Sequence, residues 1–568
     1  MVKLSKHTYR MLLGGVAIMG LLVRIPGLEQ TPPGLWLDEA GHGLDAAAIL
    51  NGLHAPIFFP GNCGREPLYT YLVAGSIALL GPTTAAVRLP AAIIGWLTIL
   101  ALAPLLHRAF NDQWLTLAAS GLLAFSRWHV HFSRIAFRGI LVPLFAIMTW
   151  WSLLKALHTR RRRDFLVAGI ILGLSMYSYT PVRMLLPMAM VIILLHAWLE
   201  RKPLRVIVSG SGIMILMFTI TALPLIIYMR THPGAVTARL RMTSIMALDG
   251  GLLSNLRVSA ITYLGMFHVH GDWLLRHNIP GAPMLDPLTG ILFVVGILMA
   301  LHRCRRPAYL TSVLFTVAFL VPGILSSYGP HALRTLALPP FISILAGLPL
   351  AAAARRWRRI GSALTCMVVV ISGAWNMYLY CIPWHGMVVS VPLEKDCVDG
   401  LDIGEVAAVN WIRQHSAAHP KESYYLSPQL YFHATLQYLL YRRVDVEPAI
   451  VDGIPSDGPI AHVVLNLTPR NAWWMRDSDD KKYAYWWQLH YGMRLGQIHS
   501  VKIRGYPPGT NFTRVSDELL LNRLKERFPL GSLETGQGFA VFHCASASQP
   551  TAPRSNRPVQ VNSQPVNR

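Results

Sequence analysis

Long runs of apolar residues alternate with short polar segments over the first two-thirds of the chain. The runs fall near residues 10–27, 88–107, 113–127, 138–157, 165–179, 182–199, 206–229, 287–302, 308–327, 332–351 and 360–381. Many of them approach the ~20 residues that a membrane-spanning helix needs. The pattern therefore predicts an α-helical polytopic membrane protein with about eleven transmembrane helices.

A shorter apolar run, PLYTYLVAGSIALLG at 67–81, ends in Gly-Pro. If it crossed the membrane, the basic loops that follow would lie outside. We interpret it as an interfacial or re-entrant helix, which puts five basic loops on one side: HRAFND, HTRRRRD, ERKPLR, HRCRRPA and ARRWRR. Because arginine and lysine mark cytoplasmic loops, we expect a plasma-membrane protein with its N-terminus in the cytoplasm. Its C-terminal region is then extracytoplasmic.

Composition agrees with a membrane protein. Hydrophobic residues make up 53% of the chain, charged residues only 14%, and the mean hydropathy is +0.40. The formal net charge of +23 is also typical of nucleic-acid binding proteins. Here the excess lies largely in short arginine clusters between apolar runs, which membrane orientation explains. We therefore expect a lipid bilayer, and no nucleic acid, as a partner.

The composition becomes more polar from about residue 390. DIGEVAAVNWIRQHS has helical spacing with an aspartate cap, and AHVVLNLT and GFAVFHCA have the pattern of buried strands. We predict a transmembrane domain over 1–385, an extracytoplasmic α/β domain over 390–545, and a disordered, Pro-rich tail over 546–568.

Six cysteines occur without a CxxC motif, which gives no support to a zinc ribbon or a redox dithiol. Cys397 and Cys544 bracket the C-terminal domain. If that domain lies outside the cytoplasm, these two residues can form one disulfide.

Two adjacent carboxylates, Asp38 and Glu39, follow the first apolar run in PPGLWLDEAGHG. An isolated pair of this kind is most often a helix cap or a solvated turn. Near a bilayer, however, desolvation raises a carboxyl pKa and neighbouring arginines lower it. Such a group suits a general base that takes a proton from an incoming hydroxyl or amine. Glu66, beside Arg65, adds a second acid on the same predicted side.

The polar loops on this side are rich in arginine, histidine and tyrosine. Arginines at the ends of spans often only extend to the interface, and tyrosines often form an aromatic belt. The functional alternative is an anion site. Its candidate phosphate-binding residues are Arg65, Arg88, His131, Arg134, Arg183 and Arg334, and its candidate pocket residues are Tyr177, Tyr179, His268, His270 and Asp272. The alternate histidines of WHVHF resemble metal-ligand spacing, but that loop has no acid or cysteine to complete a site, so we expect no metal.

One or two acids and several arginines at the membrane surface would suit an enzyme that transfers a group from a lipid phosphate to an acceptor. The arginines would hold an anionic lipid head group, the acid would activate an acceptor, and lipid phosphate would leave. Neither GxxxxGK nor GxGxxG is present, so no nucleotide site is predicted.

Several motifs, in order along residues 10–380, are similar to a known family. LWLDEAGHG, REPLYTYLVAGSIALLG, AAVRLPAAIIGWLTI, FSRWHVHFSRIAFRGILVPLF, YSYTPVRMLLP and PGILSSYGPHALRTLALPP resemble the GT-C superfamily of membrane glycosyltransferases. Within it, the chain looks like glycosyltransferase family 39. That family includes dolichyl-phosphate-mannose protein mannosyltransferases and the aminoarabinose transferase of bacteria.

The resemblance implies a polyprenyl-phosphate-linked sugar donor, an extracytoplasmic active site and inversion at the anomeric carbon. It also implies that Asp38 is the catalytic acidic residue of the first outer loop and that Arg88 lies near the donor phosphate. Arg-Glu-Pro at 65–67 departs from the His-Pro or Lys-Pro of many relatives, which leaves the donor sugar and the role of Glu66 open.

The acceptor also stays open between protein, lipid and polysaccharide, and no cofactor is expected. Two alternatives stay open. The protein could be a transporter or flippase of an anionic lipid or sugar, or a non-catalytic assembly partner. A transporter would more typically show internal repeats and polar residues near the bilayer midplane.

Overall fold

The computed structural model describes residues 4–61, 64–200, 204–234, 237, 243–249, 251–327, 329–384, 401–431, 433–441, 444–449, 454–456, 459–465, 517–536 and 539–545. The chain divides into two compact units. The membrane unit comprises Met1–Pro32, His54–Gly81 and Ala85–Ser390. The C-terminal unit comprises Pro33–Leu53, Pro82–Thr84 and Val391–Arg568. This grouping differs from the predicted division, because the segment with Asp38 and Glu39 belongs to the C-terminal unit.

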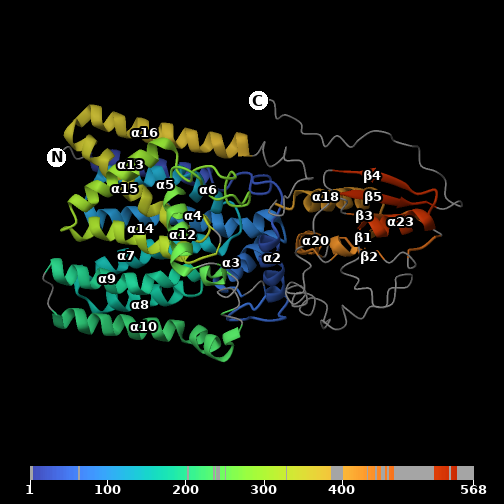
Figure 1. Ribbon diagram of the computed structural model, residues 1–568, viewed down its shortest axis with the longest axis horizontal. Helices are drawn as coiled ribbons and strands as arrows, with labels where there is room; N and C mark the ends of the chain where they lie inside the picture. Colours follow the sequence, from blue (N-terminus) through green and yellow to red (C-terminus); the bar gives the residue numbers. More distant parts are fainter. Residues whose placement is uncertain are drawn as a thin grey trace. The chain divides into compact units, whose positions relative to one another are not determined.

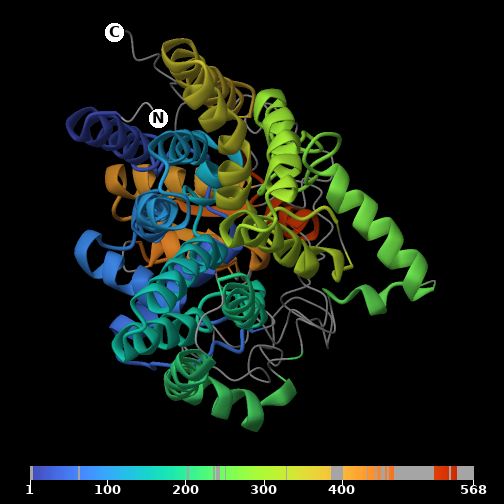
Figure 2. The same ribbon diagram turned by 90° about the vertical axis from the view of Figure 1, so that its left-hand side faces the viewer.

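The membrane unit is helical (Figure 1). Its elements are α1 (Lys6–Leu22), α3 (Leu68–Leu80), α4 (Thr84–Phe110), α5 (Gln113–Phe125), α6 (Arg127–Phe132), η1 (Arg138–Ile140), α7 (Leu141–Thr159), α8 (Arg162–Ser175), η2 (Thr180–Met184), α9 (Leu185–Leu199), α10 (Leu204–Thr231), η3 (Ile245–Ala247), α12 (Leu252–Gly265), α13 (Pro287–His302), α14 (Pro307–Ile324), α15 (Leu338–Arg356), α16 (Arg358–Leu379) and the π-helical η4 (Tyr380–Trp384). Many of the long helices run side by side, and Figure 2 views them more nearly along their axes.

Seven stretches in the described part of the chain are long and apolar enough to cross a membrane. They are Thr84–Phe110, Arg138–Thr159, Thr180–Leu199, Ile207–Thr231, Pro307–Ile324, Leu338–Arg356 and Arg358–Ile382. Leu68–Leu80, Gln113–Phe125 and Pro287–His302 are shorter apolar helices. The first of these is the predicted re-entrant segment, and it does form a helix. The number of eleven spans and the orientation stay predictions.

Helix α15 lies at the centre of the packing and contacts α5, α13, α14 and α16. Phe341 on α15 stacks on Phe315 of α14, with ring centroids 4.5 Å apart. At Gly296 of α13, an added Cβ would come within 1.9 Å of the Leu345 carbonyl oxygen, so α13 and α15 approach closely there. Small residues permit such contacts between membrane helices.

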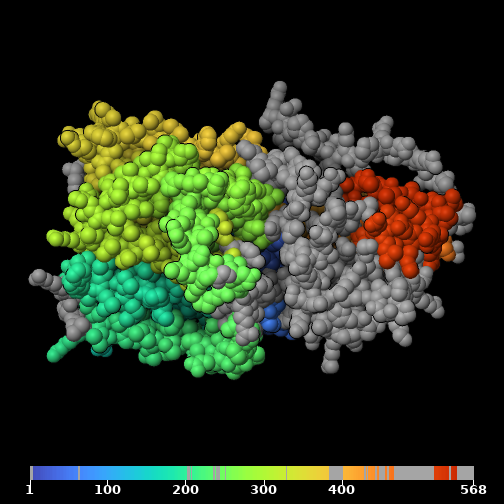
Figure 3. All heavy atoms as spheres, in the orientation of Figure 1, coloured from blue at the N-terminus to red at the C-terminus, as the bar shows by residue number. Residues whose placement is uncertain are grey.

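Helices α10 and α16 lie at the periphery and expose large apolar side chains. Only 17% of the most apolar stretch of α10 is buried, and only 28% of that of α16. Figure 3 shows α10 in green along one side of the viewed face and α16 in yellow along the other. Exposed apolar residues on α10 and α16 include Leu216, Ile220, Ile227, Val370 and Ile371. Such a surface suits lipid rather than water.

The C-terminal unit contains a mixed five-stranded sheet in the order β2-β1-β3-β5-β4. Its elements are α2 (Leu37–Leu50), α18 (Ile403–Ala418), β1 (Ser423–Leu426), α19 (Pro428–Tyr431), α20 (Ala434–Leu440), β2 (Glu447–Pro448), β3 (Ala461–Leu465), α23 (Asp517–Arg527), β4 (Ser532–Thr535) and β5 (Ala540–Cys544). Strand β1 is parallel to β2 and β3, and β5 is antiparallel to β3 and β4. Helix α2 packs on α20, where Gly43 leaves room for the Tyr438 ring.

Both predicted strands are present, as β3 and β5, and the predicted helix is α18. The predicted aspartate cap is wrong, because the Asp402 side chain makes no capping hydrogen bond and instead accepts one from Thr435 Oγ1. Cys544 is buried, and burial raises the pKa of its thiol to about 12. Cys397 and the tail over 546–568 lie outside the described residues, so the disulfide stays a prediction.

Candidate functional site

The two carboxylates that open α2 have different environments. Glu39 is fully buried, and its side chain accepts a hydrogen bond from the Trp36 backbone N–H at 3.1 Å. It therefore caps its own helix, as the structural interpretation of the pair expects. Asp38 is half-buried in the first turn, where the partial positive charge of the helix N-terminus favours a carboxylate. Of the pair, Asp38 is the more exposed carboxylate.

Helix α2 carries two further ionisable residues that the sequence analysis did not single out. His42 and Asp45 are both buried. With Asp38 they have i, i+4, i+7 spacing, so all three lie on one face of the helix. That spacing was the available signal in the sequence.

In the membrane unit, the segment after α1 is held by arginines. The Arg134 guanidinium donates from Nη1 to the Val23 carbonyl at 2.9 Å. Its Nη2 donates to the carbonyls of Pro26 at 2.7 Å, Gly27 at 3.0 Å and Thr31 at 3.0 Å. Its Nε also donates to the Thr31 carbonyl, at 3.2 Å. All three of its nitrogens are thus engaged. This geometry supports a positioning role for Arg134 better than the predicted phosphate contact.

Arg88 and Arg24 hold the same part of the chain. Arg88 is fully buried and donates from Nη1 to the carbonyls of Leu28, at 3.0 Å, and Pro32, at 2.7 Å. Arg24, which the sequence analysis did not single out, contacts His129 Nδ1 at 2.9 Å and the Ala124 carbonyl at 2.9 Å. Together these arginines fix the chain that precedes α2.

Glu66 lies in a buried ion pair. Its Oε2 is 2.9 Å from Arg138 Nε, its Oε1 accepts a hydrogen bond from Thr180 Oγ1 at 3.1 Å, and both charged side chains are less than a tenth exposed. The Arg138 guanidinium also lies over the Tyr179 ring, 5.1 Å from its centroid. With both oxygens engaged, Glu66 joins the loop before α3 to η1 and η2. A catalytic role for Glu66 stays a prediction, and its partners favour a positioning role.

The other predicted arginines differ in exposure. Arg65 is buried, donates from Nε to the Gly61 carbonyl at 3.4 Å and lies over the Phe59 ring. Arg183 and Arg334 are half-buried. Within the described residues, no hydrogen bond or ion pair involves the Arg183 side chain. Arg183 is therefore the predicted phosphate ligand whose guanidinium is most available. Tyr177 donates to the Thr221 carbonyl at 2.9 Å.

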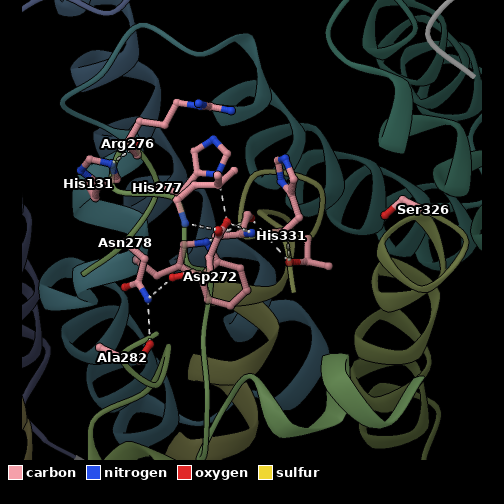
Figure 4. Close-up of polar contacts among 12 residues, drawn as sticks. His131, Asp272, Arg276, His277, Asn278, Ala282, Ser326 and His331 are labelled. Atoms are coloured by element: carbon pink, nitrogen blue, oxygen red, sulfur yellow. Dashed lines mark hydrogen bonds and ion pairs between the residues drawn. The ribbon is translucent and has the colours of Figure 1, made fainter. Parts of the chain in front are cut away.

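Residues 271–284 form an ordered loop around the buried Asp272 (Figure 4). Asp272 Oδ2 accepts from the Ala332 N–H at 2.7 Å and lies 2.9 Å from His277 Nδ1. The rings of His277 and His331 are 4.6 Å apart between centroids. These three residues could hold a cation, since their ligand atoms lie within 4.8 Å of one another. Burial lowers the pKa of His331 well below its ordinary value, which keeps this ring neutral.

The rest of this loop is anchored to α6. Asn278 accepts a hydrogen bond from Arg127 Nη1 at 2.5 Å, and His131 Nε2 contacts the Arg276 carbonyl at 2.7 Å. The contact of His131 supports a positioning role beside its predicted phosphate role. His268 and His270 are exposed and do not join Asp272, because the chain turns between them and the loop. The structure thus groups Asp272 with His277 and His331 rather than with its nearest histidines in sequence.

Comparison with known proteins gives one family match. Residues 64–248, about a third of the chain, match the sequence profile of the dolichyl-phosphate-mannose-protein mannosyltransferase family. This segment contains Glu66, Arg88, Arg134 and Arg183, and it excludes Asp38. No curated protein matches the chain.

Solved structures with similar folds include three transferases. The oligosaccharyltransferase of Archaeoglobus fulgidus, in its apo form, has 14% identity and a TM-score of 0.49, with 85% of this chain and 71% of that chain covered. ArnT of Cupriavidus metallidurans, bound to undecaprenyl phosphate, has 13% identity and a TM-score of 0.47, with coverages of 82% and 94%. The S. cerevisiae protein O-mannosyltransferase Pmt1-Pmt2 complex, bound to the sugar donor, has 18% identity and a TM-score of 0.32, with coverages of 42% and 35%.

Likeness at these levels carries no argument about residues or substrates. The family match over 64–248 agrees with the resemblance that the motifs predicted: this part of the chain is similar to the dolichyl-phosphate-mannose-protein mannosyltransferases of the GT-C superfamily.

Proposed function

We propose that this protein transfers a sugar from a polyprenyl-phosphate donor to an acceptor on the extracytoplasmic face of the membrane, with inversion. Asp38 acts as the general base, and arginines of the membrane unit hold the lipid phosphate. The observation that carries the proposal is the difference between the two acids of α2. Glu39 is used as a cap, whereas Asp38 is half-buried at a helix N-terminus.

The donor phosphate needs cationic groups that are not already engaged. Arg183 meets this condition best, since no described residue forms a hydrogen bond or ion pair with its side chain. Guanidinium groups bind phosphate oxygens in a bidentate manner and so fix the leaving group in position. Polyprenyl phosphate leaves with the bonding electrons of the anomeric C–O bond while the acceptor oxygen or nitrogen forms the new bond. Asp38 takes the acceptor proton in the same step.

The test is an Asp38→Asn variant of the full chain, purified in detergent. A panel of polyprenyl-phosphate sugars serves as donor, and a cell-envelope extract serves as the source of acceptor. Loss of a general base is expected to lower turnover by about 10²–10⁴-fold, whereas binding of polyprenyl phosphate should be unchanged.

Glu39→Gln is the matched control. It should lower the stability of the C-terminal unit by about 1 kcal/mol through the weakened cap, while turnover stays within a few-fold of the parent. A transporter or scaffold would tolerate Asp38→Asn. Equal turnover of Asp38→Asn and the parent would therefore refute the proposed role.

A further inference from the structure

A cluster of histidines and carboxylates lies in the C-terminal unit, and none of its members has a part in the proposed transfer reaction. His415 and His419 are at the end of α18, and Glu422 is in the turn that leads to β1. His462 is on β3, where it pairs directly with His543 of β5. Five ionisable residues from a helix, a turn and two strands therefore meet at one edge of the helix–sheet core.

The ligand atoms of His415, Glu422 and His462 all lie within 4.8 Å of one another, so these three side chains converge on one point. Glu422 Oε2 lies 2.7 Å from His462 Nε2 and 3.1 Å from His415 Nε2, and Glu422 Oε1 lies 3.6 Å from His419 Nδ1. His415 and His419 are one helical turn apart on the same face, with ring centroids 4.6 Å apart. Trp411 stacks on His415 and fixes its ring.

The contacts of this cluster need one more proton or cation than two neutral imidazole rings supply. His462 Nδ1 lies 2.8 Å from His543 Nδ1, and His543 Nε2 lies 3.1 Å from Glu534 Oε2. The series Glu422, His462, His543, Glu534 thus contains three contacts, each of which needs one proton. Two neutral imidazoles carry only two N–H groups. The third contact therefore has room for a cation in place of a proton.

A cation bound at His462 Nε2 removes this shortfall. It occupies the position of the missing proton, so His462 Nδ1–H donates to His543 Nδ1 and His543 Nε2–H donates to Glu534. Both rings are then neutral with every nitrogen satisfied. Histidine ligands of metals characteristically donate their second N–H to such a partner, which fixes the tautomer and the ring orientation.

We propose that His415, Glu422 and His462, with His419 as a fourth ligand, bind a divalent transition metal of the zinc type. Imidazole and carboxylate ligands suit zinc, whereas magnesium and calcium prefer oxygen ligands alone. Zinc lies about 2.0–2.2 Å from such ligands, which separates them by about 3.3 Å in a tetrahedron. To reach this separation, Glu422 Oε2 has to move away from His462 Nε2 by about 0.6 Å and from His415 Nε2 by about 0.2 Å. The ion joins the end of α18 to β3, and with four protein ligands it is structural.

The test uses the full chain, purified through a tag without histidines, stripped with a chelator and titrated with Zn²⁺ or Co²⁺. We expect one tightly bound ion per chain, visible absorption bands of tetrahedral Co²⁺, and a higher melting temperature with Zn²⁺ than with Mg²⁺. Glu534→Gln changes the partner of His543 rather than the direct partner of a ligand, so it should weaken binding by less than the roughly 10–100-fold that loss of a direct partner costs.

Removal of the buried His462 could unfold the unit, so the ligand test uses the more exposed pair. The double variant His415→Gln/His419→Gln should lose the tight binding and the Co²⁺ bands while keeping the melting temperature of the metal-free parent. His302→Ala, which removes an exposed histidine at the end of α13, is the control and should bind as the parent does. Absence of tight binding by the parent would overturn the proposal. So would unchanged binding by the double variant, since the ion would then lie elsewhere, for example at Asp272, His277 and His331.

Discussion

Arg134 has two possible roles, phosphate binding and support of the backbone. Its sequence context does not distinguish them, but substitution of Arg134 does. Its side chain donates to the carbonyl oxygens of Val23, Pro26, Gly27 and Thr31. Arg134→Ala leaves the Val23, Pro26 and Thr31 carbonyls without this donor, whereas Gly27 still accepts from the backbone N–H groups of Gln30 and Thr31. A buried unsatisfied group costs about 1–3 kcal/mol, so the three carbonyls set a range of about 3–9 kcal/mol. Water that enters the gap offsets part of this, and we expect about 4 kcal/mol of destabilisation.

Arg134→Lys is expected to be nearly as harmful. It keeps the charge, but a single ammonium group cannot reach carbonyls that a planar guanidinium spans with three nitrogens. The assay is unfolding of the full chain in detergent, followed by intrinsic fluorescence, alongside steady-state transfer kinetics.

Arg183→Ala is the matched variant. Because no described residue bonds to the Arg183 side chain, its loss should change stability by no more than about 0.5 kcal/mol and should raise the KM for the donor instead. The reasoning is refuted if Arg134→Ala keeps the parent's stability and raises the donor KM, since Arg134 would then bind the phosphate as the sequence predicted.

Three further predictions follow from buried groups and from the expected chemistry. Glu66→Gln should destabilise the membrane unit by about 3–5 kcal/mol, because it leaves Arg138 buried without its counter-ion. The double variant Glu66→Gln/Arg138→Gln should recover part of that loss. Strictly additive losses in a double-mutant cycle would show that the pair does not interact. Because the folded pKa of Cys544, about 12, exceeds its ordinary value of 9.0, its stabilising effect is complete below about pH 9 and is lost as pH rises towards 12. Cys544→Ala should therefore flatten the alkaline limb of the stability curve, and an unchanged limb would contradict the burial of the thiol. Chelation should leave the chemical step of transfer intact at temperatures where the C-terminal unit stays folded; a loss that added divalent ion restores there would mean that a metal takes part in the reaction.

Hydropathy was sufficient to predict most of the helices in the membrane unit. The expected runs at 138–157 and 308–327 correspond to α7 and α14, and even the ambiguous run at 67–81 is helical. This success has a simple cause, because backbone groups in lipid must be satisfied within the segment itself, so composition alone favours helix. Strands β3 and β5 could also be predicted from the residues of each segment alone.

The roles of the individual charged residues could not be predicted in the same way. Arg134 and Arg183 both lie in polar stretches beside apolar runs, yet one is saturated by carbonyls more than a hundred positions away and the other is available. Long-range packing decides which arginine is engaged, and the spacing of residues in the sequence does not predict such packing. Glu39 is different, because its capping contact with Trp36 is local and a helix cap was one of the interpretations of the pair. The pair His415 and His419 had a visible i, i+4 spacing, but Glu422 and His462 complete the group only through the topology of the sheet.

The packing of α2 against α20 determines how this protein can be divided in experiments. Gly43 accommodates the Tyr438 ring, and the Thr435 hydroxyl donates to the Leu35 carbonyl at 3.0 Å. A fragment that begins near residue 391 would lack a helix of its own core and would expose the apolar surface that α2 covers. Conversely, a chain truncated before α20 would leave the helix that carries Asp38 without its support. Neither half is an autonomous folding module, and the first loop must be synthesised long before the partner that completes its packing.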